Sequence, residues 1–412
     1  MLTHNPSALR TSYPERLQAI LSMETAAETR AWLTHWPRLS AAPTPLWELP
    51  GLAAQLGIAS LAIKDESARS ELGSFKALGA PAALVRLINR LMPELPPPGI
   101  LKGEFRTEVS KLTVISASAG NHGRALAAAA ESIGCACVIV LHAQVNAERA
   151  AAIAAYGARI VRIAGDYDDS VTEAARLASE NDWYVVSDTS YPGYEAIPRD
   201  VMQGYGTIAA EVIEQAIAPF THVFLQSGVG GLAAGVASYL WEYYGAARPR
   251  LISVEPTQAD CLYQSARQGK ASQASGTVNS LMAGLACGNA SPLAWQIISL
   301  AVDDFLTIED EEAVSAMRML AAGSERDIPV VAGESGAAGL AGLLSIARTP
   351  AYSASIGLGP ESRVLLINTE GATAPMAYQQ LVNQSAACVA ERQMHWLATN
   401  GQNEGCRQRE CE

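Results

Sequence analysis

Between residues 112 and 254, short runs rich in valine and isoleucine alternate with longer amphipathic segments. The short runs are apolar throughout, which is typical of strands that are buried on both faces of a parallel sheet. Parallel neighbours need crossover connections, and the amphipathic segments have the length of crossover helices. The sequence therefore predicts an α/β fold with parallel-rich open sheets flanked by helices. We expect strands at residues 61–64, 112–116, 136–141, 159–163, 183–187, 222–226, 251–254 and 364–368.

Helical patterns fill most of the remaining chain. Residues 1–40 are helical in pattern up to the break at Pro43 and Pro45, whereas the polar segment 99–111 predicts a loop. The last dozen residues are polar, so we expect them to be loosely held. Further helices are expected at residues 52–56, 77–92, 123–133, 146–156, 169–180, 204–215, 232–244, 311–322 and 337–346.

Length and charge exclude several classes of function. With 412 residues, 49% of them apolar, the chain can bury a sizeable core in one or two domains. Its net charge of -12, without a cluster of Lys or Arg, argues against nucleic acid or an anionic membrane as the main partner. No apolar stretch approaches the roughly 20 residues of a membrane span, and the N-terminus does not resemble a signal peptide. We therefore expect a soluble, cytoplasmic protein.

The seven cysteines are scattered, unlike those of a secreted disulfide framework. Cys135 and Cys137 lie in an apolar run with a spacing that predicts a buried strand and no metal site. Cys261 and Cys287 flank a loop-like segment and can face each other, although a reducing compartment disfavours a stable bridge. We expect no bound metal.

Lys76 is the strongest candidate for a reactive side chain. Gly73, Ser74 and Phe75 precede it, and small apolar residues follow it at the start of an expected helix. Crowding by backbone and by an aromatic ring lowers the pKa of an amine and prepares it to attack a carbonyl. A plain exposed lysine at a helix start is the simpler interpretation, and motifs further along the chain argue against it.

Two glycine-containing loops lie where an expected strand ends and a helix begins. In the first, SASAGNHG (116–123), backbone N–H groups converge on an anion, and Asn121 can bond a substituent of a planar ring. The second, SGVGGL (227–232), can hold a single phosphate at a helix N-terminus. With Ala233 and Glu255 it also fits a loose dinucleotide-binding pattern, so a nicotinamide or flavin site is a rival interpretation.

Polar residues also follow two other expected strands, at the edge where ligands of open α/β sheets bind. Asp188 comes directly after residues 183–187, where it either caps the next turn or faces a ligand. Asn368 ends the last expected strand and Thr369 follows it. An amide or hydroxyl at this position can meet a ring nitrogen.

A nucleophilic lysine, a phosphate-sized glycine loop, an asparagine for a ring hydroxyl and a neutral partner for a ring nitrogen together describe a pyridoxal phosphate site. The set resembles the tryptophan-synthase-like, or fold type II, pyridoxal phosphate enzymes. From about residue 40 to residue 380 it is similar to diaminopropionate ammonia-lyase. The segments that carry this similarity are KDES (64–67), GSFKALG (73–79), GYEAIP (193–198), MQGYGT (202–207), MAGLACG (282–288), GESG (333–336) and TEG (369–371).

The resemblance implies a homodimer of two-domain chains. It places a large cofactor-binding domain at residues 1–80 and 195–390, a smaller mobile domain at 81–194 and a polar C-terminal tail at 391–412. Lys76 becomes the Schiff-base lysine, with Phe75 near the ring, Asn121 at the phenolic oxygen and either Asn368 or Thr369 near the pyridine nitrogen. We expect Ser118, Asn121 and Asp188 to bind the amino acid substrate. The phosphate is assigned to Gly228, Val229, Gly230, Gly231 and Leu232.

The implied reaction is α,β-elimination of 2,3-diaminopropionate to pyruvate and ammonia. Lys76 removes the Cα proton, and Asp188 holds the second amine. In the ammonia-lyases an aspartate directly precedes the Gly-Asn-His segment, where it is implied to act on the D-isomer, whereas this chain has Ala119. We therefore predict activity on the L-isomer and little or none on the D-isomer.

Two alternatives remain. A serine or threonine dehydratase-like enzyme would use the same cofactor, and the SAGNH form of the loop is nearer to those enzymes. A non-catalytic paralogue that only binds the cofactor is disfavoured because Lys76, Asn121 and the glycine loop are all present.

Overall fold

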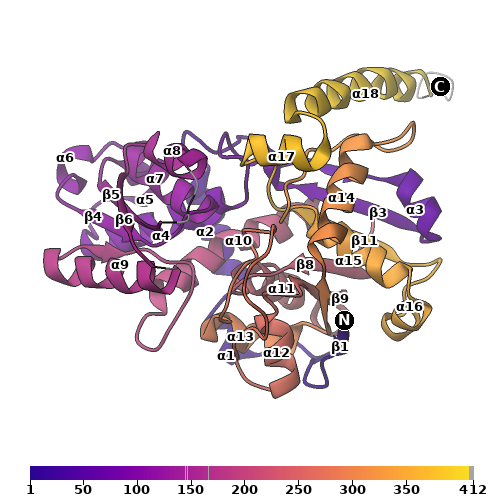
Figure 1. Cartoon of the computed structure of the whole chain (residues 1–412), viewed down its shortest axis with the longest axis horizontal. Coiled ribbons are helices and arrows are strands. Elements are labelled where there is room, and N and C mark those ends of the chain that lie inside the picture. The colour runs from indigo at the N-terminus through magenta and orange to yellow at the C-terminus, as the bar shows by residue number, and fades with distance from the viewer. Residues whose placement is uncertain (144, 146, 166, 408–412) are drawn as a thin grey trace.

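The computed structural model describes residues 1–143, 145, 147–165 and 167–407, with side chains up to residue 400. Two sheets lie on opposite sides of the molecule, each covered by helices (Figure 1). The larger sheet has seven strands in the order β1 (Leu2–His4), β10 (Asp304–Ile308), β9 (Arg250–Pro256), β8 (His222–Gln226), β11 (Arg363–Asn368), β3 (Ser60–Asp65) and β2 (Leu46–Glu48). The smaller sheet has four, in the order β6 (Arg159–Ile163), β5 (Ala136–His142), β4 (Thr113–Ser116) and β7 (Tyr184–Val185).

Both sheets are mainly parallel. The five central strands of the larger sheet run parallel, and β1 and β2 add to its edges in the antiparallel sense. All pairs of the smaller sheet are parallel. The strands β8 and β11 are almost entirely buried, as expected for apolar runs covered on both faces. This confirms the predicted α/β class.

The helices follow the strands as crossover connections and as end caps. Those near the smaller sheet are α4 (Lys76–Leu91), α5 (Pro97–Lys102), α6 (Arg106–Val109), α7 (Asn121–Ile133), α8 (Ala147–Ala154) and α9 (Tyr167–Asn181). The others are α1 (Glu15–Gln18), α2 (Met23–Leu33), α3 (Pro50–Leu56), α10 (Ala196–Gln215), α11 (Gly231–Tyr244), α12 (Cys261–Gln268), α13 (Pro292–Ala301), α14 (Asp310–Ala322), α15 (Ala338–Ala347), α16 (Pro350–Ile356), α17 (Pro375–Val382) and α18 (Ala386–Arg407). Short 3₁₀ turns are η1 (Glu66–Ala68) and η2 (Gly245–Ala247).

Helix α10 packs against α4 at very short range. A Cβ on Gly204 would lie 2.1 Å from the carbonyl oxygen of Leu78, and a Cβ on Gly79 would lie 2.7 Å from the phenolic oxygen of Tyr205. Only glycine fits at these two positions, so the two helix backbones approach closely. As a result, Tyr205 of α10 reaches the first turn of α4, where Lys76 lies.

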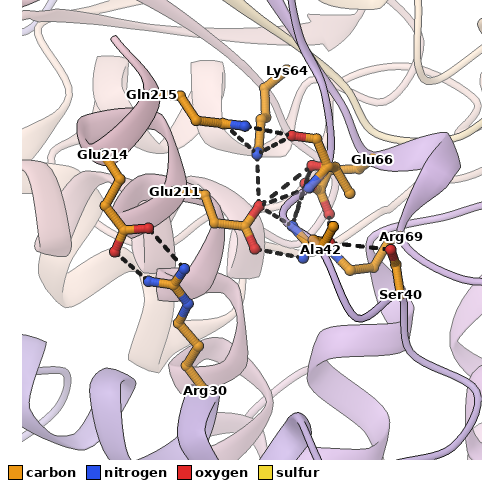
Figure 2. Close-up of polar contacts among 10 residues, drawn as sticks. Arg30, Ser40, Ala42, Lys64, Glu66, Arg69, Glu211, Glu214 and Gln215 are labelled. Carbon is orange, nitrogen blue, oxygen red and sulfur yellow. Dashed lines mark hydrogen bonds and ion pairs between the residues drawn. The ribbon is translucent and has the colours of Figure 1, made fainter.

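A buried cluster of charged side chains joins β3, η1 and α10 (Figure 2). We call Lys64, Glu66, Arg69 and Glu211 the Lys64 cluster. Lys64 Nζ lies 2.6 Å from Glu211 Oε2, and Arg69 contacts both glutamates at 2.7 Å. Lys64 also donates to the carbonyl of Thr44 and to Gln215. Two positive and two negative charges therefore compensate each other away from water.

Several expectations for the secondary structure were wrong. The predicted loop 99–111 contains α6 and most of α5, because Pro97 and Pro98 occupy the first turn of α5, where proline is tolerated. For the same reason α10 can include Pro198 in its first turn. The helix begins at Ala196, which is eight residues before the predicted start at Gly204. The expected helical region 1–40 contains only α1 and α2, and it begins with an edge strand.

The strands β1, β2 and β10 were not predicted. The first two have three residues each, too few to show a periodic pattern, and their edge positions leave them half-exposed. The predicted start of one helix at Asn146 lies outside the described residues, and α8 begins at Ala147. Cys135 and Cys137 are buried beside and within β5, as the sequence predicts.

The C-terminal region includes one long helix, α18, which projects from the body of the molecule in Figure 1. Its first turns are attached to the preceding elements, since Arg392 donates to the carbonyl of Ala321 and Trp396 donates to that of Ser324. The side chains of residues 401–412 lie outside the described residues. The division into two domains and a polar tail stays a prediction. None of the described helices combines the length and the apolar character needed to cross a membrane.

Candidate active site

The backbone around Lys76 is held by the loop that follows β11. Lys76 is the first residue of α4, and Gly73 before it adopts a left-handed conformation with φ of 67°. Phe75 N–H donates to the carbonyl of Thr369 at 3.0 Å, and Ser74 forms a bridge with Glu370. Glycine makes the sharp turn possible, and the bridge fixes the direction in which the lysine leaves it.

The amine of Lys76 forms an ion pair with Asp188. Nζ lies 2.6 Å from Oδ2, and it also lies 4.9 Å from the centre of the Phe75 ring and 5.6 Å from that of Tyr205. Burial lowers the pKa of Lys76, but the charge and hydrogen bond of Asp188 together with Tyr205 outweigh burial and raise that pKa above its ordinary value. The expectation of a lowered pKa is therefore wrong for this state, because the sequence does not reveal that a carboxylate faces the amine.

Asp188 follows β7, as predicted, and it lies beside two basic groups. Burial alone would raise the pKa of its carboxyl, but Lys76 and His122 together hold that pKa below its usual range. His122 Nδ1 lies 3.9 Å from the same oxygen that Lys76 contacts. Asp188 is therefore a carboxylate beside the Lys76 amine, and its role toward a ligand stays a prediction.

Asn121 is the first residue of α7, directly after the loop that follows β4. Its amide donates to the carboxylate of Glu370, which also accepts from Ser335 N–H at 3.1 Å. Ser118 Oγ accepts from the N–H of Gly123 at 3.2 Å. The structure thus brings Asn121 to the same segment that borders Lys76, whereas the hydroxyl of Ser118 stabilises its own loop.

The glycine loop connects β8 to α11 and leaves little room for side chains. A Cβ on Gly228 would lie 2.8 Å from the sulfur of Cys287 and 3.0 Å from the carbonyl of Gly284, and Gly230 has φ of 101°. The first N–H groups of a helix have no acceptor within it, and the helix dipole favours an anion there. A compact loop of this kind at a helix N-terminus can hold a phosphate, and the assignment of the phosphate to Gly228, Val229, Gly230, Gly231 and Leu232 stays a prediction.

Asn368 and Thr369 have different surroundings. The amide of Asn368 donates to Asp65 Oδ1 at 2.8 Å and to the carbonyl of Val331 at 3.0 Å. Thr369 Oγ1 accepts from the amide of Gln226 at 3.3 Å. The donor groups of Asn368 are thus engaged in the core, whereas the hydroxyl hydrogen of Thr369 can still be donated.

The two loop cysteines are free thiols in the structure. Cys261 Sγ donates to the carbonyl of Gly228 at 3.5 Å, and Cys287 borders the same glycine from the other side. Burial raises the pKa of the Cys287 thiol to about 12, so it is protonated and inert as a nucleophile. Both cysteines thus border Gly228, and no bridge joins them, as the disfavoured bridge in the sequence-based expectation implies.

Four groups at the site were not singled out from the sequence. Tyr205, Tyr167, His122 and Glu370 come from four separate segments, and long-range packing brings them together. His122 and Glu370 lie inside recognised motifs, so the signal was present for them. Tyr205 lies within MQGYGT, but nothing in the sequence connects it to Lys76.

Comparison with known proteins identifies this arrangement. The family model described as "Pyridoxal-phosphate dependent enzyme" matches residues 38–370. Diaminopropionate ammonia-lyase of Escherichia coli strain K12 is 36% identical over 356 residues, covering 84% of this chain and 89% of that protein. The chain belongs to the diaminopropionate ammonia-lyase family of pyridoxal-phosphate dependent enzymes.

Solved structures agree with this family. The selenomethionine holo structure of the E. coli ammonia-lyase has a TM-score of 0.84 at 34% identity, covering 93% of this chain and 96% of that one. L-threonine dehydratase of Haemophilus influenzae is only 28% identical over 300 residues, covering 73% of this chain and 52% of that protein. The predicted fold type II architecture and the predicted cofactor are thereby confirmed.

The residues at the site fit pyridoxal phosphate. An amine, a glycine loop in which a Cβ on Gly228 would collide with Cys287 and Gly284, and a helix N-terminus occur together at the ends of parallel strands. The rival dinucleotide interpretation does not hold, because the carboxylate of Glu255 accepts from the N–H groups of Leu262 and Tyr263 at the start of α12. It is engaged there and does not face a ribose.

Proposed function

We propose that this enzyme converts L-2,3-diaminopropionate to pyruvate and ammonia by α,β-elimination. The observation that carries the proposal is the Lys76–Asp188 ion pair, which places a base and a carboxylate side by side. An amino acid with a second amine needs both groups, one to take a proton from Cα and one to hold the extra positive charge. Pyridoxal phosphate bound here supplies a ring that accepts the electron pair released at Cα.

Lys76 has two roles in this proposal. Its Nζ would be the point of covalent attachment of the cofactor, and the same nitrogen, once free, would take the Cα proton of the substrate. The raised pKa of Lys76 keeps Nζ in its ammonium form, which donates a hydrogen bond to Asp188. The proton therefore has to leave before the amine can act as a nucleophile, and Asp188 is the nearest acceptor.

Asp188 holds the second amine of the substrate. Its carboxylate is largely buried, so a cation that replaces Lys76 beside it is bound without competition from bulk water. A β-hydroxyl group carries no charge and gains less from such a partner. Asp188 thus favours diaminopropionate over serine or threonine.

The remaining contacts orient the cofactor. Residues 228–232 would hold the phosphate at the start of α11, and Asn121, at the start of α7, would bond the phenolic oxygen. Thr369 would meet the ring nitrogen, since Asn368 is already bonded to Asp65. The rings of Phe75 and Tyr205 pack against each other with 4.7 Å between their centres, and both lie beside the amine of Lys76.

Dehydratase-like elimination is the second candidate, favoured by the SAGNH loop and by the threonine dehydratase relative. Purified enzyme assayed with L-2,3-diaminopropionate, L-serine and L-threonine separates the two. Release of pyruvate from the diamine at a higher kcat/KM than release from serine supports the proposal. A higher kcat/KM on serine or threonine contradicts it.

We further propose a cytoplasmic homodimer whose smaller domain, residues 81–194, moves relative to the rest of the chain. The resemblance to the ammonia-lyases implies the dimer, and the exposed side chains of Met376 on α17 and Met394 on α18 offer apolar contact area. The confinement of the four-stranded sheet to residues 113–185 supports the small domain. Sedimentation of the purified enzyme tests the dimer, and a monomer would refute it.

A further inference from the structure

One nitrogen of His122 is bonded and the other is not. The side chain is 3% exposed, and Nε2 lies 3.0 Å from the carbonyl oxygen of Val186. A carbonyl only accepts, so Nε2 carries the hydrogen and Nδ1 presents a lone pair. Among the described side chains Nδ1 has no hydrogen-bond partner, yet it lies 3.9 Å from Asp188 Oδ2.

This arrangement leaves room for one more proton between the two groups. A neutral imidazole lone pair that faces a carboxylate is repulsive, whereas a proton on either atom turns the repulsion into attraction. A proton on Nδ1 makes an ion pair, and a proton on Asp188 makes an O–H group that can donate to Nδ1. The pair can therefore store a proton and pass it on.

While the Lys76 amine is free and charged, the surrounding charges keep His122 and Asp188 without the shared proton. Burial lowers the pKa of His122, Asp188 raises it and the ammonium of Lys76 lowers it again, with a net decrease. The other titratable groups near Asp188 are the phenols of Tyr205, Tyr194 and Tyr167 and the thiol of Cys287. All four are neutral, because the pKa of each is raised above its ordinary value. Whenever the Lys76 amine is without its positive charge, His122 is the remaining basic neighbour of Asp188.

We propose that His122 is a positioning residue that shares a proton with Asp188, and that this pair keeps the leaving nitrogen protonated. The inference rests on the proposed function. When the bond between Cβ and nitrogen breaks, the electron pair of that bond stays on nitrogen. The nitrogen must then hold three protons to leave as ammonia. A proton missing from it passes from His122 Nδ1 through the Asp188 carboxyl, so that Asp188 ends as a carboxylate and His122 ends neutral with its hydrogen on Nε2.

The test compares His122→Gln with the wild-type holoenzyme. A glutamine amide can keep the bond to Val186 O but has no titratable nitrogen facing Asp188. We expect kcat on L-2,3-diaminopropionate to fall at least tenfold, with KM changed less than threefold and the alkaline limb of the kcat pH profile displaced. On β-chloro-L-alanine, whose chloride leaves without a proton, kcat should stay within about threefold of wild type.

An equal loss of kcat on both substrates would overturn the inference, because it indicates a merely structural role for His122. An unchanged kcat on the diamine would overturn it as well. His122→Asn is the second variant, with an amide placed near Nδ1, and it is expected to give the same split if the glutamine variant does not fold. Failure of the proposed function gives a different result. Wild-type enzyme would then be inactive on the diamine but active on L-serine, whose departing hydroxyl also needs a proton, and the same comparison of variants is made with serine.

Discussion

The ammonium of Lys76 and the carboxylate of Asp188 meet at 2.6 Å, although 112 residues separate them along the chain. Burial acts against both charges, since it lowers the pKa of Lys76 and raises that of Asp188, and the mutual attraction reverses both shifts. The pair therefore persists through the neutral pH range. It joins the first residue of α4 to the segment that follows β7, so the reactive amine and its partner come from separate elements.

Replacing Lys76 by alanine removes the amine that binds the cofactor and takes the Cα proton. We expect the visible absorbance of the lysine-bound cofactor to disappear and turnover of L-2,3-diaminopropionate to become undetectable. Lys102→Ala, at a half-exposed lysine on α5, is the control and should behave as wild type. Residual turnover by the Lys76 variant would refute its assignment as the base.

Asp188→Asn keeps the shape of the side chain but removes its charge. The cofactor should still bind, because Lys76 is intact, while kcat/KM on L-2,3-diaminopropionate falls about a hundredfold. The KM for the diamine should rise more than the KM for L-serine, since only the diamine carries a second charge. Equal changes for both substrates in steady-state assays would argue against a role for Asp188 in holding the second amine.

Ala119 lies beside Asn121 in the loop before α7 and offers no base. We predict that Ala119→Asp gains activity on the D-isomer of at least tenfold, because a carboxylate would then face the substrate on the side opposite Lys76. The control is Ala119→Asn, because asparagine has nearly the same volume as aspartate but cannot act as a base. It should not gain activity on the D-isomer. Comparable wild-type rates on both enantiomers would show that the missing aspartate does not control stereochemistry.

The Lys64 cluster predicts a large loss of stability when one of its charges is removed. Glu211→Gln leaves Lys64 and Arg69 without full compensation in the core, and we expect the free energy of unfolding to fall by about 3 kcal/mol. Glu214→Gln on the same helix breaks the more exposed pair with Arg30 and should cost less than about 1 kcal/mol (Figure 2). Urea unfolding of the holoenzyme measures both, and similar losses would contradict this difference.

Thr369→Val tests which residue meets the ring nitrogen. Valine has nearly the same shape as threonine but cannot donate or accept, so we expect kcat to fall about tenfold while the fold is retained. Thr369→Ser restores the hydroxyl and should recover most of the activity. Full activity of the valine variant would point to Asn368 instead.

The sequence predicts the fold and the site to different extents. The buried parallel strands, such as β8 and β11, were predicted because short, continuous apolar runs between helices are typical of strands covered on both faces. Three-residue edge strands and helices that begin at proline were missed, since local patterns there are too short or point to a break. The family segments located Lys76, Asn121 and the glycine loop through their order along the chain.

The charge state of the site was beyond sequence reasoning. The crowding around Lys76 predicted a lowered pKa, and the pKa is raised because Asp188 approaches from a distant segment. Similarly, nothing in the motifs indicated that the amide of Asn121 contacts Glu370, or that Asn368 is occupied by Asp65. Such pairings depend on the tertiary fold, whereas the motifs report only which side chains are present.

The most direct test of the central claim is a side-by-side assay of pyruvate and ammonia release by the purified holoenzyme, with both enantiomers of 2,3-diaminopropionate, L-serine and L-threonine as substrates. We predict the highest kcat/KM for L-2,3-diaminopropionate, with one pyruvate and two ammonia molecules released per substrate and little release from the D-isomer. A higher kcat/KM for L-serine or L-threonine than for the L-diamine would contradict the account.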